Sequence, residues 1–228
     1  MHYKLLLFDA DETLFDFVKS QAFALKQSTL DHKITHPYSE LERIYEDINT
    51  KIWQEFEEGL IKVADLKVDR FRRLFKTLGL DIDSSAFAKT YMRNLGSASY
   101  IYEGVPKLLH ELEGKYRMAI ITNGLTAVQS RRIRQSDIKE FFEEIVISEE
   151  ITLVKPDPKI FDYTLEKLGH MDRKSVLMVG DNLKSDILGG INAGIDTCWL
   201  NAGGQKNVSD IHPTFEIQSV LDIQSILE

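Results

Sequence analysis

The sequence has little cysteine and no long hydrophobic run. Cys198 is the only cysteine among the 228 residues, so no disulfide can form within the chain. A protein without disulfides fits a reducing cytoplasm. The apolar run near the start is soon followed by acidic residues, which argues against a signal peptide, and no apolar segment approaches the length needed to span a bilayer. We therefore expect a cytoplasmic protein that does not enter a membrane.

Basic residues are outnumbered by acidic ones. The 28 lysines and arginines face 36 aspartates and glutamates, which gives a net charge of −8. A protein that wraps long nucleic acid needs a basic surface, so that class of partner is excluded. One local pocket of cations can still bind a small phosphate ester. The expected partner is therefore a small phosphorylated metabolite, and the sequence leaves the oligomeric state open between monomer and dimer.

Short apolar runs that are typical of buried parallel strands recur along the chain. They cover residues 4–8, 117–122, 144–148, 175–180 and 195–200. Amphipathic helical patterns lie between the later runs, and the tail is compatible with a further edge strand and a closing helix. Strands that alternate with helices predict an α/β fold, a Rossmann-like parallel sheet with helices on both faces.

One large gap interrupts this alternation. The residues between the first and second runs show helical spacing and almost no strand signal. The simplest explanation is an all-helical domain inserted after the first strand. We place this insertion at residues 16–100 and the α/β core at residues 1–15 and 101–228.

Residues with reactive side chains follow four of the predicted strands. They are Asp9, Asp11, Thr122, Asn123, Lys155 and Asp181. Each one alone fits a helix cap, a turn or a solvated loop. Ligands of open parallel sheets bind outside the carboxyl ends of the strands, however, and these residues all lie at that edge. Their shared position favours a functional site.

The residue types at this edge suit phosphoryl transfer. An aspartate can attack phosphorus and form an acyl-phosphate, while Mg²⁺ on oxygen ligands neutralises the phosphate oxygens. Lysine, a threonine hydroxyl and backbone N–H groups can hold the equatorial oxygens. Asp11, two residues after Asp9, suits protonation of the leaving oxygen and later activation of water.

The same residues match four motifs in order along nearly the whole chain. These are "DADET" from Asp9, "IITNG" with Thr122, "VKPDP" with Lys155, and "GDNLKSD" with Asp181 and Asp186. In this the chain resembles the haloacid dehalogenase (HAD) superfamily of phosphohydrolases. The helical insertion then matches the position of the helical cap domain of that superfamily.

The resemblance implies a role for each motif residue. Asp9 is the expected nucleophile and Asp11 the expected general acid and base. The expected phosphate-binding residues are Thr122, Asn123 and Lys155. Mg²⁺ is expected on the carboxylate of Asp9, the backbone carbonyl of Asp11, and Asp181, with Asp186 bound directly or through water. Dehalogenases of the superfamily lack an aspartate at the position of Asp11, so the resemblance favours a phosphatase.

The stretches "FDADETLFDF" and "INTKIWQEFEEG" further resemble the YjjG-type pyrimidine nucleotidase branch. That likeness implies a Mg²⁺-dependent 5′-nucleotidase acting on nucleoside 5′-monophosphates, with pyrimidines favoured. Asn49, Trp53 and Phe56 are candidate base contacts in the cap, although aromatic residues at helical spacing also suit packing. Two alternatives stay open: a sugar-phosphate or phosphoglycolate phosphatase or phosphomutase with the same core, and a non-enzymatic phosphate-binding module.

Two features have no assigned catalytic role. Glu12 stands where the first motif commonly has glycine, and its purpose is open. The basic run "RRIR" at residues 131–134 is expected to form a solvated helix face.

Overall fold

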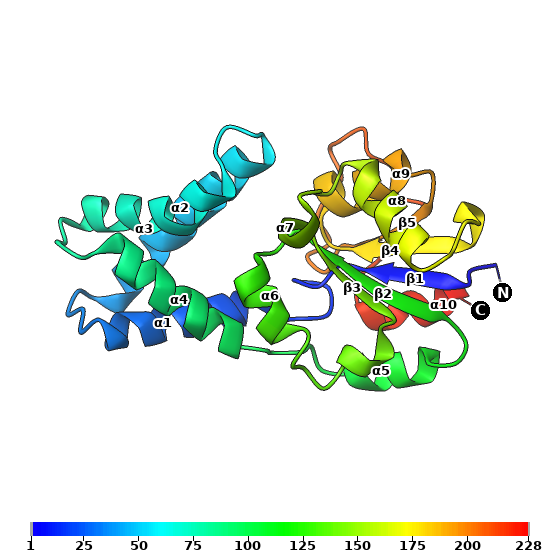
Figure 1. The fold of residues 1–228 in the computed structure, drawn as a ribbon, viewed down its shortest axis with the longest axis horizontal. Helices are drawn as coiled ribbons and strands as arrows, with labels where there is room; N and C mark the ends of the chain where they lie inside the picture. Colours follow the sequence, from blue (N-terminus) through cyan, green and yellow to red (C-terminus); the bar gives the residue numbers. More distant parts are fainter. Residues whose placement is uncertain (1, 228) are drawn as a thin grey trace. The chain divides into compact units, whose positions relative to one another are not determined.

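The computed structural model describes residues 2–227 and forms two compact units. One contains Met1–Val18 and Ser99–Glu228, and the other contains Lys19–Ala98. The first unit holds the sheet and the second is all-helical (Figure 1). The predicted α/β fold, with helices inserted after the first strand, is thus confirmed. The roles of the two units as catalytic core and cap remain predictions at this stage.

The sheet has six parallel strands in the order β3-β2-β1-β4-β5-β6. In chain order the strands are β1 (Leu5–Phe8), β2 (Arg117–Thr122), β3 (Glu144–Ile147), β4 (Val176–Gly180), β5 (Asp196–Leu200) and β6 (Phe215–Ile217). After β3 the chain returns to the other side of β1, so β1 and β4 are neighbours although far apart in sequence. This reversal is where open α/β sheets bind their ligands.

Helices cover both faces of the sheet, as Figure 1 shows for α5 (Val105–Leu112) and α8 (Pro158–Lys167). Successive side chains of β1 point to opposite faces of the sheet, and all four are apolar, so β1 contributes to the core on both faces. Leu6 and Phe8 point into the core that contains α5, while Leu5 and Leu7 point into the core beneath α8.

The remaining elements of this unit are short; most connect the strands, and the last two follow the final strand. They are α6 (Thr126–Arg132), η1 (Lys139–Phe141), α7 (Ser148–Ile151), η2 (Arg173–Ser175), η3 (Leu183–Ile187), α9 (Leu188–Asn192), η4 (Val220–Ile223) and α10 (Gln224–Leu227). The predicted edge strand and closing helix of the tail are β6 and the η4–α10 segment.

α9 approaches the sheet closely because it contains glycine at the contact. A Cβ built on Gly190 would lie 2.5 Å from Cγ2 of Thr197 on β5 and 3.4 Å from Cβ of Met178 on β4. The first distance is far below van der Waals contact. Any side chain at this position would therefore push α9, and with it the preceding η3, away from the sheet.

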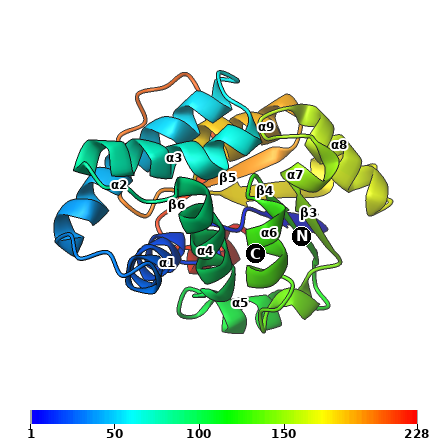
Figure 2. The same cartoon turned by 60° about the vertical axis from the view of Figure 1, so that its left-hand side comes forward.

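The helical unit has its own aromatic core. Its helices are α1 (Phe17–Asp31), which begins in the first unit, α2 (Tyr38–Glu57), α3 (Val63–Leu78) and α4 (Ser84–Ser97). α3 packs against both α2 and α4 (Figure 2). The ring of Phe71 on α3 lies 5.7 Å from that of Tyr45 and 4.9 Å from those of Phe87 and Tyr91. These buried rings form the apolar core of the helical unit.

Within residues 2–227, each helix is either too short or too polar to cross a bilayer.

The contact at Gly190 gives a prediction with an unusual sign. Glycine to alanine normally stabilises a helix, but Gly190→Ala should lower the free energy of unfolding by about 1–3 kcal/mol, since the new methyl group overlaps Thr197. Urea unfolding followed by circular dichroism measures the change. Ile191→Ala, on the exposed side of the same helix, is the control and should change stability little. A stabilised Gly190→Ala variant would contradict this packing.

Candidate active site

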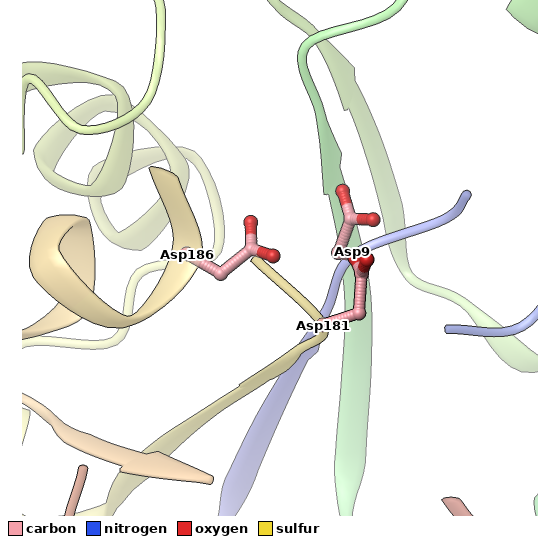
Figure 3. A group of neighbouring side chains, drawn as sticks. All are labelled: Asp9, Asp181 and Asp186. Carbon is pink, nitrogen blue, oxygen red and sulfur yellow. The ribbon is translucent and has the colours of Figure 1, made fainter. Parts of the chain in front are cut away.

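Three carboxylates meet at the carboxyl ends of β1 and β4. Asp9 directly follows β1, Asp181 directly follows β4, and Asp186 lies in η3 (Figure 3). Oxygen atoms of the three lie within 4.8 Å of one another. They converge because β1 pairs with β4, so residues about 170 positions apart leave the sheet side by side.

Lys155 supplies the positive charge of this cluster. Its ammonium group is buried and donates to Oδ1 of Asp9 and to Oδ1 of Asp186, both at 2.6 Å, and to the carbonyl oxygen of Ile121 at 2.7 Å. Burial alone would lower the pKa of Lys155, but Asp186 and Asp9 outweigh it and hold that pKa above its usual value. Lys155 therefore stays charged and orients two of the carboxylates.

Asp186 is held in place by the turn that follows β4. Its Oδ2 accepts the backbone N–H of Asn182 at 3.0 Å, and the Asn182 side chain in turn accepts the backbone N–H groups of Lys184 and Ser185. A Cβ on Gly180 would lie 2.3 Å from Oδ2 of Asp186, so only glycine leaves room for this carboxylate. Residues of the motif "GDNLKSD" thus fix the Asp186 carboxylate beside β1 through local hydrogen bonds and the space left by glycine.

The acidic cluster fits a hard divalent cation. Burial raises the pKa of Asp9 to about 7 and that of Asp181 to about 9, and in both cases repulsion from Asp186 adds to the shift while Lys155 opposes it. One lysine thus leaves the cluster short of positive charge. Its donor atoms are carboxylate oxygens, the ligands that Mg²⁺ prefers. A bound cation would favour the ionised carboxylates, as metal sites generally do.

Thr122 ends β2 and Asn123 directly follows it beside this cluster, and their contacts differ. Oγ1 of Thr122 accepts the backbone N–H of Gly124 at 3.2 Å and Nε2 of Gln129 at 3.0 Å, which leaves its O–H proton to be donated elsewhere. The side chain of Asn123 exchanges two hydrogen bonds of 2.9 Å with the backbone of Lys155. Asn123 therefore positions the loop that carries the lysine.

Asp11 is paired with Arg132, which belongs to the basic run that is expected to face solvent. Nη1 of Arg132 donates to Oδ1 of Asp11 at 2.6 Å, and the Arg132 side chain has no exposed surface. The expected solvated face of "RRIR" is wrong for Arg132, although Arg134 does lie at the surface, paired with Glu150. The missed signal is helical periodicity, because Leu125, Val128 and Arg132 fall on one buried side.

Glu12 has a structural environment that the sequence did not indicate. It is one of the few non-glycine residues with positive φ, 58°. Its carboxylate accepts the backbone N–H of Val18 at 2.9 Å and the hydroxyl of Tyr102 at 2.8 Å. Glu12 thereby ties the segment leaving β1 to the segment that returns before α5, directly after the motif acids.

A cavity of about 520 Å³ borders the acidic cluster, with Glu12, Asp181, Trp199 and Asn201 among its lining residues. Its size lies in the range of small-molecule sites. The indole N–H of Trp199 donates to the carbonyl oxygen of Asp181 at 2.8 Å and so fixes the loop at the cavity wall.

The candidate base contacts lie in α2 of the helical unit. Trp53 and Phe56 are half-buried and pack edge to face, with ring centroids 5.8 Å apart. Asn49 is buried, and its side chain donates to Gln21 at 3.0 Å and accepts from Arg70 at 3.0 Å. The amide of Asn49 is thus engaged inside the unit, whereas the two aromatic rings keep exposed surface.

The comparisons with known proteins agree with the motifs. The model of the haloacid dehalogenase-like hydrolase family matches residues 6–200. Pyrimidine 5′-nucleotidase YjjG of Escherichia coli is 35% identical over 100% of this chain and 99% of its own length. Pyrimidine 5′-nucleotidase PynA of Streptococcus pneumoniae is 34% identical over 100% of this chain and 96% of its own. A magnesium-bound crystal structure of the HAD-hydrolase YfnB from Bacillus subtilis superposes with a TM-score of 0.94 at 33% identity and full coverage of both chains.

The ion pairs of Lys155 lead to a stability prediction. Lys155→Met should lower the free energy of unfolding by about 3–5 kcal/mol in metal-free buffer, because it leaves two buried carboxylates without their cation. Lys167→Met removes a surface pair with Glu144 and should cost less than about 1 kcal/mol. Urea denaturation of both variants measures the difference. Equal losses would show that the buried ammonium is not a structural requirement.

Proposed function

The chain belongs to the haloacid dehalogenase-like hydrolase family, and we propose that it is a Mg²⁺-dependent phosphatase of nucleoside 5′-monophosphates. Pyrimidine nucleotides are the favoured substrates, and hydrolysis proceeds through an aspartyl-phosphate on Asp9. The observation that carries the proposal is the convergence of Asp9, Asp181 and Asp186 around Lys155 at the carboxyl ends of β1 and β4.

The proposed metal ligands are the carboxylates of Asp9 and Asp181 and the backbone carbonyl of Asp11, with Asp186 bound directly or through water. When bound, Mg²⁺ would offset the negative charge of the phosphate oxygens, which otherwise repel an attacking carboxylate. The supporting observations are the oxygen donor set and the raised pKa of Asp9 and Asp181.

The residues of this chain divide the reaction into two steps. In the first, a carboxylate oxygen of Asp9 bonds to phosphorus, the bond to the ester oxygen breaks, and Asp11 gives that oxygen a proton. In the second, Asp11 takes a proton from water, and the water oxygen displaces the Asp9 carboxylate from phosphorus. Lys155 and the hydroxyl of Thr122 hold the equatorial oxygens. Lys155 also keeps the Asp9 side chain in one orientation.

Nucleotides are proposed over other phosphate esters because the relatives YjjG and PynA carry that activity in their names. The helical unit is the proposed cap, with boundaries near residues 16 and 100, and a cap would exclude water and contact the base. Trp53 and Phe56 are its proposed stacking residues, and Asn49 is the weaker candidate because its amide is already paired. A cytoplasmic location fits the single buried cysteine.

The proposal predicts a defined substrate profile. In the presence of Mg²⁺, the protein should release phosphate from pyrimidine nucleoside 5′-monophosphates faster than from sugar phosphates or phosphoglycolate, and EDTA should abolish the activity. Asp9→Asn should lower kcat by at least about 10³-fold, because the amide cannot act as the nucleophile. A phosphate-release assay over a substrate panel measures both.

Asp210→Asn, an exposed aspartate outside the site, is the control for the Asp9 variant and should keep full activity. Much faster turnover of sugar phosphates than of any pyrimidine nucleotide would overturn the nucleotidase assignment. Absence of hydrolysis across the whole panel would favour a phosphate-binding module instead.

A further inference from the structure

Arg132 ends α6 in an environment that is unusual for an arginine. Its side chain is fully buried, and its Nη1 donates to Oδ1 of Asp11 at 2.6 Å. Its Cζ lies 5.4 Å from the ring centroid of Phe15 and 5.1 Å from that of Phe17. Cation–π contacts of this kind restrain the guanidinium group. The hydrogen-bond donor of Asp11 is therefore a guanidinium group whose position is restrained by two aromatic rings.

Gln129, one helical turn earlier, holds the other oxygen of Asp11. Its Nε2 donates to Oδ2 of Asp11 at 2.8 Å and to Oγ1 of Thr122 at 3.0 Å. Its Oε1 accepts from Nη1 of Arg132 at 3.1 Å, so the two α6 side chains also fix each other. Gln129 is buried. Both oxygens of Asp11 are thus bound by side chains of one short helix.

This network leaves part of the Asp11 carboxyl group accessible. Two donors occupy only about two of the four lone-pair sites of a carboxylate. The Asp11 side chain keeps 25% of its surface exposed, although Arg132 beside it has none. The network therefore restricts the orientation of the carboxyl group and not its access to a reacting atom.

We propose that Arg132 and Gln129 are positioning residues that hold the Asp11 carboxyl group at the leaving-group oxygen and in register with Thr122. This inference rests on the proposed phosphatase function and assigns a task to α6 within it. A small misplacement of a catalytic group lowers the rate strongly, so loss of the network should resemble loss of the acid itself. Because Gln129 bridges Asp11 and Thr122, it couples the proton donor to the phosphate-binding hydroxyl.

The leaving group of the substrate tests this role. A nucleoside leaves as a poor alkoxide that needs a proton, whereas 4-nitrophenol leaves readily without one. Arg132→Met should lower kcat/KM about 100-fold for a pyrimidine nucleoside 5′-monophosphate, and less than about 10-fold for 4-nitrophenyl phosphate. Gln129→Leu should show the same selective loss. Arg134→Met, which removes the exposed pair with Glu150, is the matched control and should change neither value.

A double-mutant cycle separates positioning from a general structural effect. If Arg132 acts through Asp11, then Arg132→Met should cause no further loss of nucleotide kcat/KM in an Asp11→Asn background. Circular dichroism and thermal unfolding establish that each variant is folded. If Arg132→Met does not fold, the same cycle is made with Gln129→Leu, and its result decides.

Equal losses on both substrates, or additive losses in the cycle, would overturn the positioning role. The activity of the unmodified protein shows whether the positioning role or the proposed phosphatase function is wrong. If that protein hydrolyses neither substrate, the phosphatase proposal itself fails. If it hydrolyses both and the variants show no leaving-group dependence, only the roles of Arg132 and Gln129 are wrong.

Discussion

The ammonium group of Lys155 lies between Asp9 and Asp186, 2.6 Å from an oxygen of each, in the interior of the molecule. Isolated buried carboxylates are costly, and this cation makes their gathering possible. The surrounding residues hold Lys155 and the two carboxylates in position for these ion pairs. Asn123 holds the backbone of Lys155, Gly180 leaves space for Asp186, and β1 and β4 bring the acids together.

The cluster is still short of positive charge, and this connects structure with chemistry. Burial and mutual repulsion raise the pKa of Asp9 and Asp181 despite Lys155. A divalent cation is the natural complement to such a site. Asp11, only two residues from Asp9, has different partners, because Arg132 and Gln129 hold its carboxylate. Two neighbouring acids thereby acquire different environments, as nucleophilic and acid–base roles require.

Much of this arrangement could be predicted from the sequence. Buried parallel strands are continuous apolar runs, so the sequence predicts a strand at residues 117–122, the bounds that β2 has. The motif acids were recognised because their order along the chain follows the strand ends. The order of strands in the sheet could not be derived from residues alone, since it depends on contacts between distant segments.

Arg132 shows why the rest could not be predicted. Its partner Asp11 lies 121 positions away, and a basic run in an acidic chain normally faces solvent. The contacts of Glu12 with Val18 and Tyr102 were equally hidden, because only the folded chain brings the segments before and after the helical unit together.

The most direct test of this account is to trap the covalent intermediate. The protein is mixed with a pyrimidine nucleoside 5′-monophosphate and Mg²⁺, quenched with acid within the first turnover, digested, and analysed by mass spectrometry. The account predicts a phosphorylated peptide with the phosphate on Asp9. Turnover without a phosphorylated peptide, or with the phosphate on another residue, would contradict it.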